Sequence, residues 1–164
     1  MARTARGGTT GVTTGANGLP KAVSAATALW IGAVAAGAAE AAIHAWGLQN
    51  DGMSWSGLLP GLGLRALVYA VVLTVVALFH QGHRWARWAL ALGPGAVGTF
   101  SLVVESAGWL LGGGAADGIP ALTGEFVSIA ALRALHLLAV ISGVVLMFRP
   151  SANAYFGGRP RPRY

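Results

Sequence analysis

The chain has 164 residues, of which 55% are hydrophobic and only 10% are charged, and its mean hydropathy is +0.63. This composition is too apolar for a water-soluble domain and predicts an integral membrane protein. No cysteine occurs, which excludes disulfide scaffolds, thiolate metal sites, iron–sulfur clusters and covalent haem attachment.

The N-terminal segment, residues 1–18, is rich in Gly, Thr and Arg and has no apolar stripe. We therefore expect a disordered tail. A cleaved signal peptide is not predicted, because a polar stretch follows the charged start and the apolar run after it is too long for a signal core.

Two membrane spans are predicted in the first half of the chain, since about 20 apolar residues cross a hydrocarbon core about 30 Å thick. The first covers about residues 20–46 and the second about 62–81, joined by a Gly- and Ser-rich loop over 47–61. The second span needs Arg65 to be paired or to extend toward the membrane surface.

Two further spans are predicted over about residues 88–111 and 125–148. Pro94 lies near the start of the third span and predicts a kink there. Arg133 and His136 interrupt the fourth span. The expected connections are loops over 82–87 and 112–124.

The C-terminal segment, residues 150–164, is predicted to be an extended Arg- and Pro-rich tail that attracts anionic lipid or sets the topology. The predicted fold is thus all-α: an integral membrane four-helix bundle over residues 19–149 between disordered cytoplasmic tails.

The basic residues predict the orientation, because Lys and Arg near span ends stay on the cytoplasmic side. Both termini then lie in the cytoplasm, and nine of the 11 basic residues fall on that side: Arg3, Arg6, Lys21, Arg84, Arg87, Arg149, Arg159, Arg161 and Arg163. Every basic residue except Lys21 is Arg and the chain is rich in Ala and Gly, which favours a high-GC bacterial genome and hence the inner (plasma) membrane.

Four charged residues lie inside the predicted spans, away from the span ends: Glu40, Arg65, Glu105 and Arg133. A charge in this position costs about 2.5 to 3.5 kcal/mol, so we expect these side chains to face inward and to pair in the outer half of the bundle. Helical spacing adds three polar neighbours, His44, Tyr69 and His136, to the same faces.

Two interpretations of this predicted charge cluster remain open. The charges can be ion pairs that only fix helix assembly, or they can form a site for a ligand or a reaction. We expect an accessory subunit or a small-molecule binding or transport component, in contact with lipid and a lipophilic small molecule, and assembled as a homo-oligomer or with a larger membrane partner.

The alternative is an intramembrane enzyme of isomerase or cyclase type that acts on a lipophilic substrate. Glu40 and His44, four residues apart, are then the expected proton-relay pair. The full set of acid–base candidates is Glu40, Glu105, His44 and His136, and the binding candidates are Arg65, Tyr69 and Arg133.

Other motifs predict no further chemistry. His80 and His83 lack a third metal ligand, and the glycines over 93–98 match a dinucleotide fingerprint but open a membrane helix instead of following a strand. We expect no cofactor, no metal and no nucleic-acid partner.

Overall fold

The computed structural model describes residues 19–109, 111–112 and 124–157. These residues are helical apart from short turns, and they contain no strand, so the predicted all-α class is confirmed. The predicted N-terminal tail, residues 1–18, lies outside the described residues.

The first two helices are α1 (Lys21–Asn50) and α2 (Trp55–His80). The loop predicted over 47–61 is wrong, since only the four residues 51–54 separate the helices. Gly and Pro favour loops in water, but in an apolar solvent each backbone group needs an internal partner, and helix therefore extends through Gly57 and Pro60. Gly52 has φ +92° and allows the chain to reverse.

The third helical region consists of three consecutive segments, α3 (Arg84–Leu90), the π-helix η1 (Ala91–Gly98) and α4 (Thr99–Trp109). Pro94 has no N–H and its ring would collide with the carbonyl four residues earlier, and the wider π-helical turn relieves this conflict. A Cβ on Gly95 would lie 2.9 Å from the Leu90 carbonyl oxygen, so the turn also needs glycine here. The predicted kink takes the form of this π-helix.

The last two helices are α5 (Gly124–Met147) and α6 (Pro150–Gly157). The extended tail predicted from residue 150 is therefore wrong over residues 150–157. Proline fits the first turn of a helix, and Ala152 and Phe156, four residues apart, bury one face of α6. The remaining residues, 158–164, lie outside the described part of the chain.

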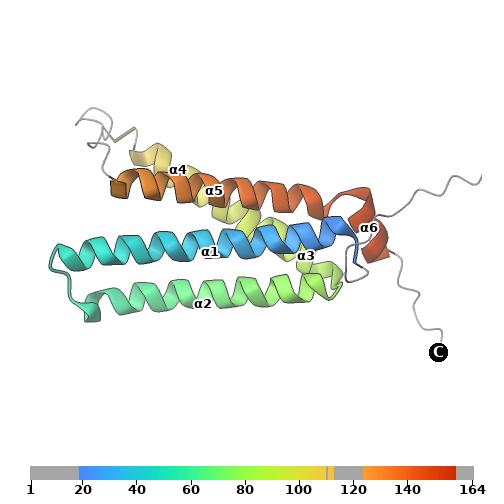
Figure 1. Cartoon of the computed structure of the whole chain (residues 1–164), viewed down its shortest axis with the longest axis horizontal. Coiled ribbons are helices and arrows are strands. Elements are labelled where there is room, and N and C mark those ends of the chain that lie inside the picture. Colours follow the sequence, from blue (N-terminus) through green and yellow to red (C-terminus); the bar gives the residue numbers. More distant parts are fainter. Residues whose placement is uncertain (1–18, 110, 113–123, 158–164) are drawn as a thin grey trace, which may run out of the picture.

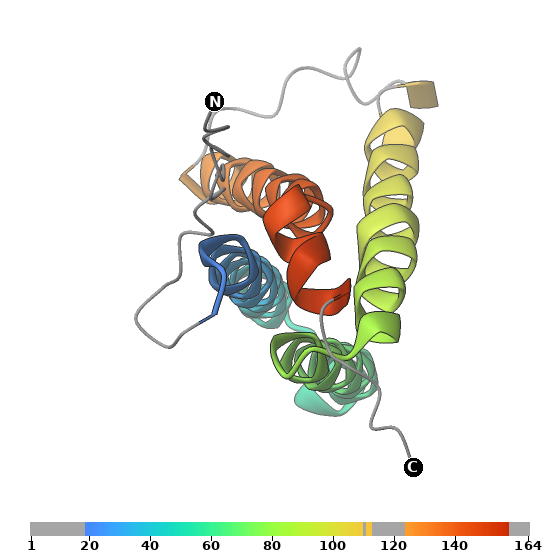
Figure 2. The ribbon, with the colours of Figure 1, turned by 90° about the vertical axis from the view of Figure 1, so that its right-hand side faces the viewer.

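The long helices run side by side, with α1 between α2 and α5 (Figure 1). The most extensive packing is between α1 and α5, followed by α1 and α2. The α3–η1–α4 series lies beside them and meets α5 mainly through η1 (Figure 2). We call the end of the bundle that carries α6 the α6 end, and the end with the α1–α2 turn the turn end.

The hydrophobic core lies at the α6 end. Trp30, on α1, is 1% exposed, and its Nε1 donates a hydrogen bond to Sδ of Met147 on α5 at 3.1 Å. Phe79 of α2 is fully buried and its ring centroid lies 5.3 Å from that of Phe156 on α6. Aromatic side chains of α1, α2 and α6, together with Met147 of α5, therefore close this end of the bundle.

Three helices of the described chain are long and apolar enough to cross a membrane: α1, α2 and residues Val127–Met147 of α5. Their outward surfaces carry large apolar side chains, including Leu64, Leu67 and Val71 on α2. A water-soluble protein rarely exposes such continuous apolar surface, which supports a membrane protein.

Candidate functional site

An ion pair joins α1 to α5 near the middle of the bundle. Nε of Arg133 donates to Oε1 of Glu40 at 2.7 Å, and the two side chains are 33% and 20% exposed. A charge-assisted contact of this length is a strong hydrogen bond. Glu40 thus contacts an arginine on another helix, and the proton-relay pair of Glu40 with His44 stays a prediction.

The charged residues lie at one level along the bundle. Glu40 is ten residues before the end of α1, Arg65 is ten residues after the start of α2, and Arg133 is nine residues after the start of α5. At about 1.5 Å per residue, all three lie about 15 Å from the turn end of their helices. The sequence placed Arg65 closer to the helix end, because the predicted second span began at residue 62.

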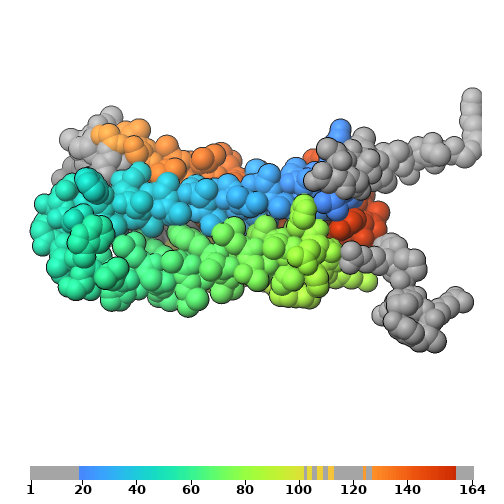
Figure 3. Space-filling model, turned by 60° about the horizontal axis from the view of Figure 1, so that its bottom comes forward, coloured from blue at the N-terminus to red at the C-terminus, as the bar shows by residue number. Residues whose placement is uncertain are grey.

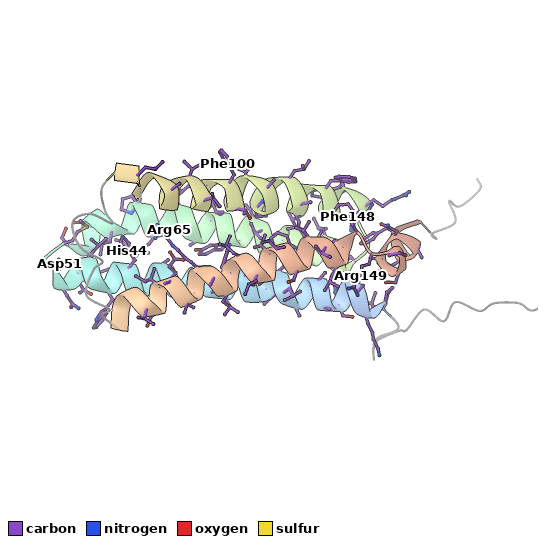
Figure 4. The ribbon with its side chains drawn as sticks, turned by 90° about the horizontal axis from the view of Figure 1, so that it is seen from above. His44, Asp51, Arg65, Phe100, Phe148 and Arg149 are labelled. Atoms are coloured by element: carbon purple, nitrogen blue, oxygen red, sulfur yellow. The ribbon has the colours of Figure 1, made fainter. Side chains whose placement is uncertain are left out.

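A cavity of about 410 Å³ opens beside this ion pair, between α1, α2, α5 and the η1–α4 series. We call it the central cavity. Its polar lining comes from six of the residues selected from the sequence: Glu40, His44, Arg65, Tyr69, Arg133 and His136. Figure 4 shows Arg65 and His44 toward the turn end, near Asp51, and far from Phe148 and Arg149 at the α6 end.

The rest of the lining is mostly apolar and was not selected from the sequence. It includes Trp30, Val34, Val72 and Val140, with Pro94 and Gly98 from η1. Helical periodicity predicts the α1 members, Trp30 and Val34, because steps of three and four residues back from Glu40 reach them on the same face of the helix. The η1 members lie at the same spacings before Glu105 in the sequence, at steps of three and four residues through Ser101.

His136 has a defined hydrogen bond at the wall of the central cavity. Its Nδ1 lies 2.8 Å from the carbonyl oxygen of Ala33 on α1. A carbonyl oxygen only accepts, so we assign the hydrogen to Nδ1, which leaves Nε2 of the neutral imidazole as an acceptor. His44, in contrast, is exposed and lines the cavity closer to the turn end.

Glu105 belongs to α4, but its side chain lies outside the described residues. Gly98 and Ser101, which precede it, line the central cavity. The predicted role of Glu105 stays a prediction.

The two histidines of the α2–α3 turn make local contacts. Nδ1 of His80 lies 3.3 Å from Oγ1 of Thr27, and Nδ1 of His83 lies 3.0 Å from the carbonyl oxygen of Leu78. Among the described residues, no three His, Asp or Glu side chains lie close enough together to hold a metal ion.

The sequence matches no protein family, and no curated protein or solved structure is significantly similar to it. The cavity and its lining are therefore the features of this chain that indicate its function.

Proposed function

We propose that this protein is a four-span membrane protein that binds a lipophilic small molecule in the central cavity, as a binding or transport component. The first, second and fourth spans correspond to α1, α2 and α5, which are long and apolar enough to cross a membrane. The third corresponds to α3, η1 and α4 taken together, which run without interruption from Arg84 to Trp109. The basic residues favour a topology with both termini in the cytoplasm.

The observation that carries this proposal is the mixed lining of the central cavity. Charged and polar groups gather around the Glu40–Arg133 pair, while Trp30, Val34 and Val140 line the apolar remainder. Ligand sites typically have volumes of about 300 to 1,000 Å³ and combine an apolar wall with a few convergent polar groups. An ion pair that only joined two helices would not need an open space beside it.

The test is photolabelling of the purified full-length protein in nanodiscs with a medium-chain alcohol that carries a diazirine. We expect saturable labelling of α1 and α5 peptides that line the central cavity. Gly98→Leu provides the decisive variant, because Gly98 lines the cavity and a Cβ there meets no atom within 4 Å. Its side chain enters the cavity without a clash, and labelling of these peptides should fall at least about fivefold.

Gly93→Leu is the matched control. Gly93 also lies in η1, has open space around its Cβ position and does not line the central cavity. Both substitutions add the same side chain to the same segment, so a difference between them reports on the cavity. Equal labelling of both variants and of the wild type would reject the proposed function.

The hydrogen bond of His136 favours a second candidate, an intramembrane acid–base enzyme. With its hydrogen assigned to Nδ1, Nε2 of His136 is the nitrogen that can accept a proton, as a general base requires, and His136 lines the central cavity. Incubation with a bacterial lipid extract in D₂O tests this candidate, because proton transfer to carbon introduces deuterium. Deuterium that appears in a lipid with the wild type and disappears with His136→Asn would favour the enzyme; no incorporation with the wild type would exclude acid–base chemistry on the lipids tested.

A further inference from the structure

A second cavity, of about 450 Å³, lies between α1 and α2 toward the turn end. We call it the α1–α2 groove. Its surface is almost wholly apolar, and a row of alanines on one face of α1 forms one side: Ala38, Ala41, Ala42 and Ala45. Trp46 and Trp55, both more than half exposed, line its outer end. The two helices that form the groove run side by side across the face shown in Figure 3.

The groove and the central cavity share part of their walls, namely Ala41, Arg65 and Tyr69. Tyr69 reaches from α2 onto α1, where its hydroxyl oxygen lies only 3.0 Å from the position that a Cβ on Gly37 would take. The tyrosine ring therefore stands between the two spaces. A molecule that occupies both must pass this ring and the side chain of Arg65.

The charges in the central cavity favour an anionic group. Its described lining contains two arginines and one glutamate, and that glutamate is paired with Arg133. Within the part of the chain that the structure describes, Arg65 has no ion-pair partner. A guanidinium group binds a carboxylate or a phosphate through two parallel hydrogen bonds. Apart from Arg65 on the shared wall, the lining of the α1–α2 groove has no charged side chain, and it suits a hydrocarbon chain.

We infer that the ligand is a single-chain lipid with an anionic head, whose carboxylate or phosphate binds Arg65 in the central cavity and whose tail lies in the α1–α2 groove. This inference rests on the proposed function and specifies its ligand class. The shared wall of Arg65 and Tyr69 separates head from tail. The groove faces outward between two membrane helices, so the lipid enters laterally from the bilayer.

The probes are hexadecanoate and hexadecyl phosphate, each brominated at the end of the chain, added to the purified full-length protein in micelles. Bromine quenches tryptophan fluorescence on contact, and Trp46 and Trp55 line the groove. We expect saturable quenching that the Trp46→Phe/Trp55→Phe double variant removes. The two anionic heads distinguish a carboxylate lipid from a phosphate lipid. A trimethylammonium head on the same brominated chain should quench without saturation.

Two substitutions separate the tail from the head. Ala42→Phe fills the groove, and Ala35→Phe, also exposed on α1 but part of neither wall, is its matched control. Ala42→Phe should weaken binding of the 16-carbon lipid about tenfold and leave binding of hexanoate, measured by isothermal titration, unchanged. Arg65→Gln should weaken both about tenfold or more, because each loses a charge-assisted hydrogen bond.

The inference is overturned if Ala42→Phe binds the 16-carbon lipid like Ala35→Phe, or if the cationic amphiphile saturates with the same affinity as the anionic one. If one of these results is found while hexanoate binding still falls in the Gly98→Leu variant, only the inference is overturned, because the central cavity remains a ligand site. Hexanoate binding that is unchanged in Gly98→Leu rejects the proposed function together with the inference.

Discussion

The two ends of this bundle are packed differently: one is filled by large side chains, and the other contains cavities. At the α6 end, Trp30, Phe79 and Phe156 fill the space between α1, α2, α5 and α6, and all are 5% exposed or less. At the turn end the corresponding space holds alanines, an ion pair and two cavities. Large aromatic side chains close one end, and small or charged side chains leave the other open. The closely packed core and the proposed ligand site therefore lie in different halves of the same helices.

Trp30 marks the boundary between these halves. Its indole packs against Gly143 of α5, where a Cβ would lie 3.2 Å from Nε1, and its other surface lines the central cavity. The glycine lets the ring enter between the helices. Trp30 therefore belongs both to the hydrophobic core and to the lining of the central cavity.

The largest expected effect is at the α6 end. Phe79→Ala removes a fully buried ring that stacks on Phe156 and should lower the free energy of unfolding by about 3 kcal/mol. This is the low end of the range for Phe→Ala, because the unfolded helices remain in lipid and much of the water-transfer term is absent. Phe100→Ala, at a side chain 69% exposed, should change it by less than about 0.5 kcal/mol. Titration with a denaturing detergent measures both, and equal losses would mean that the two ends do not differ.

The ion pair should contribute less than the aromatic core. Arg133→Ala leaves Glu40 with one strong donor fewer, and we expect a loss of about 2 kcal/mol, because both side chains are partly exposed. The double-mutant cycle with Glu40→Ala should give a coupling energy of about 1 kcal/mol or more. Arg149→Ala, an exposed arginine at the α6 end, is the control and should cost less than about 0.5 kcal/mol. A coupling energy near zero would mean that the ion pair does not stabilise the packing of α1 against α5.

The contrast between the ends also explains what the sequence predicted and what it did not. Charges inside apolar runs are expensive, so Glu40, Arg65 and Arg133 identified the candidate site, and the helical period added Tyr69 and His136. The partner of Glu40 was not predictable, because the period relates residues of one helix and says nothing about which helices pack together.

Helix ends were the other source of error. The helical start of α2 at Trp55 and the whole of α6 carry Gly, Pro, Ser or Asn, which in water favour turns. In α2 the backbone hydrogen bonds formed in an apolar solvent outweigh these preferences, and in α6 the burial of Ala152 and Phe156 does so. The apolar wall of the groove was also missed, since a row of alanines is equally typical of a tight helix contact.

Two glycines of the π-helix η1, Gly95 and Gly98, differ in how closely other atoms pack around them. Gly95→Ala places a methyl group 2.9 Å from a backbone carbonyl oxygen and 3.3 Å from Cγ2 of Val144, and should cost about 1.5 kcal/mol after the gain in helix propensity. Gly98→Ala meets no atom within 4 Å and should stabilise by a few tenths of a kcal/mol. The same detergent titration checks both. Equal signs for the two variants would mean that η1 relaxes into an ordinary helix.

The smallest expected effect concerns the outer surface of the α6 end. Nη1 of Arg87 donates to Oδ1 of Asn153 at 2.5 Å, and Nδ2 of Asn153 donates to the carbonyl oxygen of Phe148 at 3.1 Å, so this side chain ties α6 to α3. The Arg87 guanidinium also lies 4.8 Å from the centroid of the Phe148 ring and 5.4 Å from that of Phe156. These cation–π contacts hold the Arg87 guanidinium in place even when the side-chain amide of Asn153 is removed. Asn153→Ala should therefore cost only about 0.5 to 1 kcal/mol, whereas Arg87→Ala, which loses both kinds of contact, should cost about twice as much. If the two variants prove equal, the hydrogen bond accounts for the whole contribution of Arg87, and its contacts with the aromatic rings add nothing.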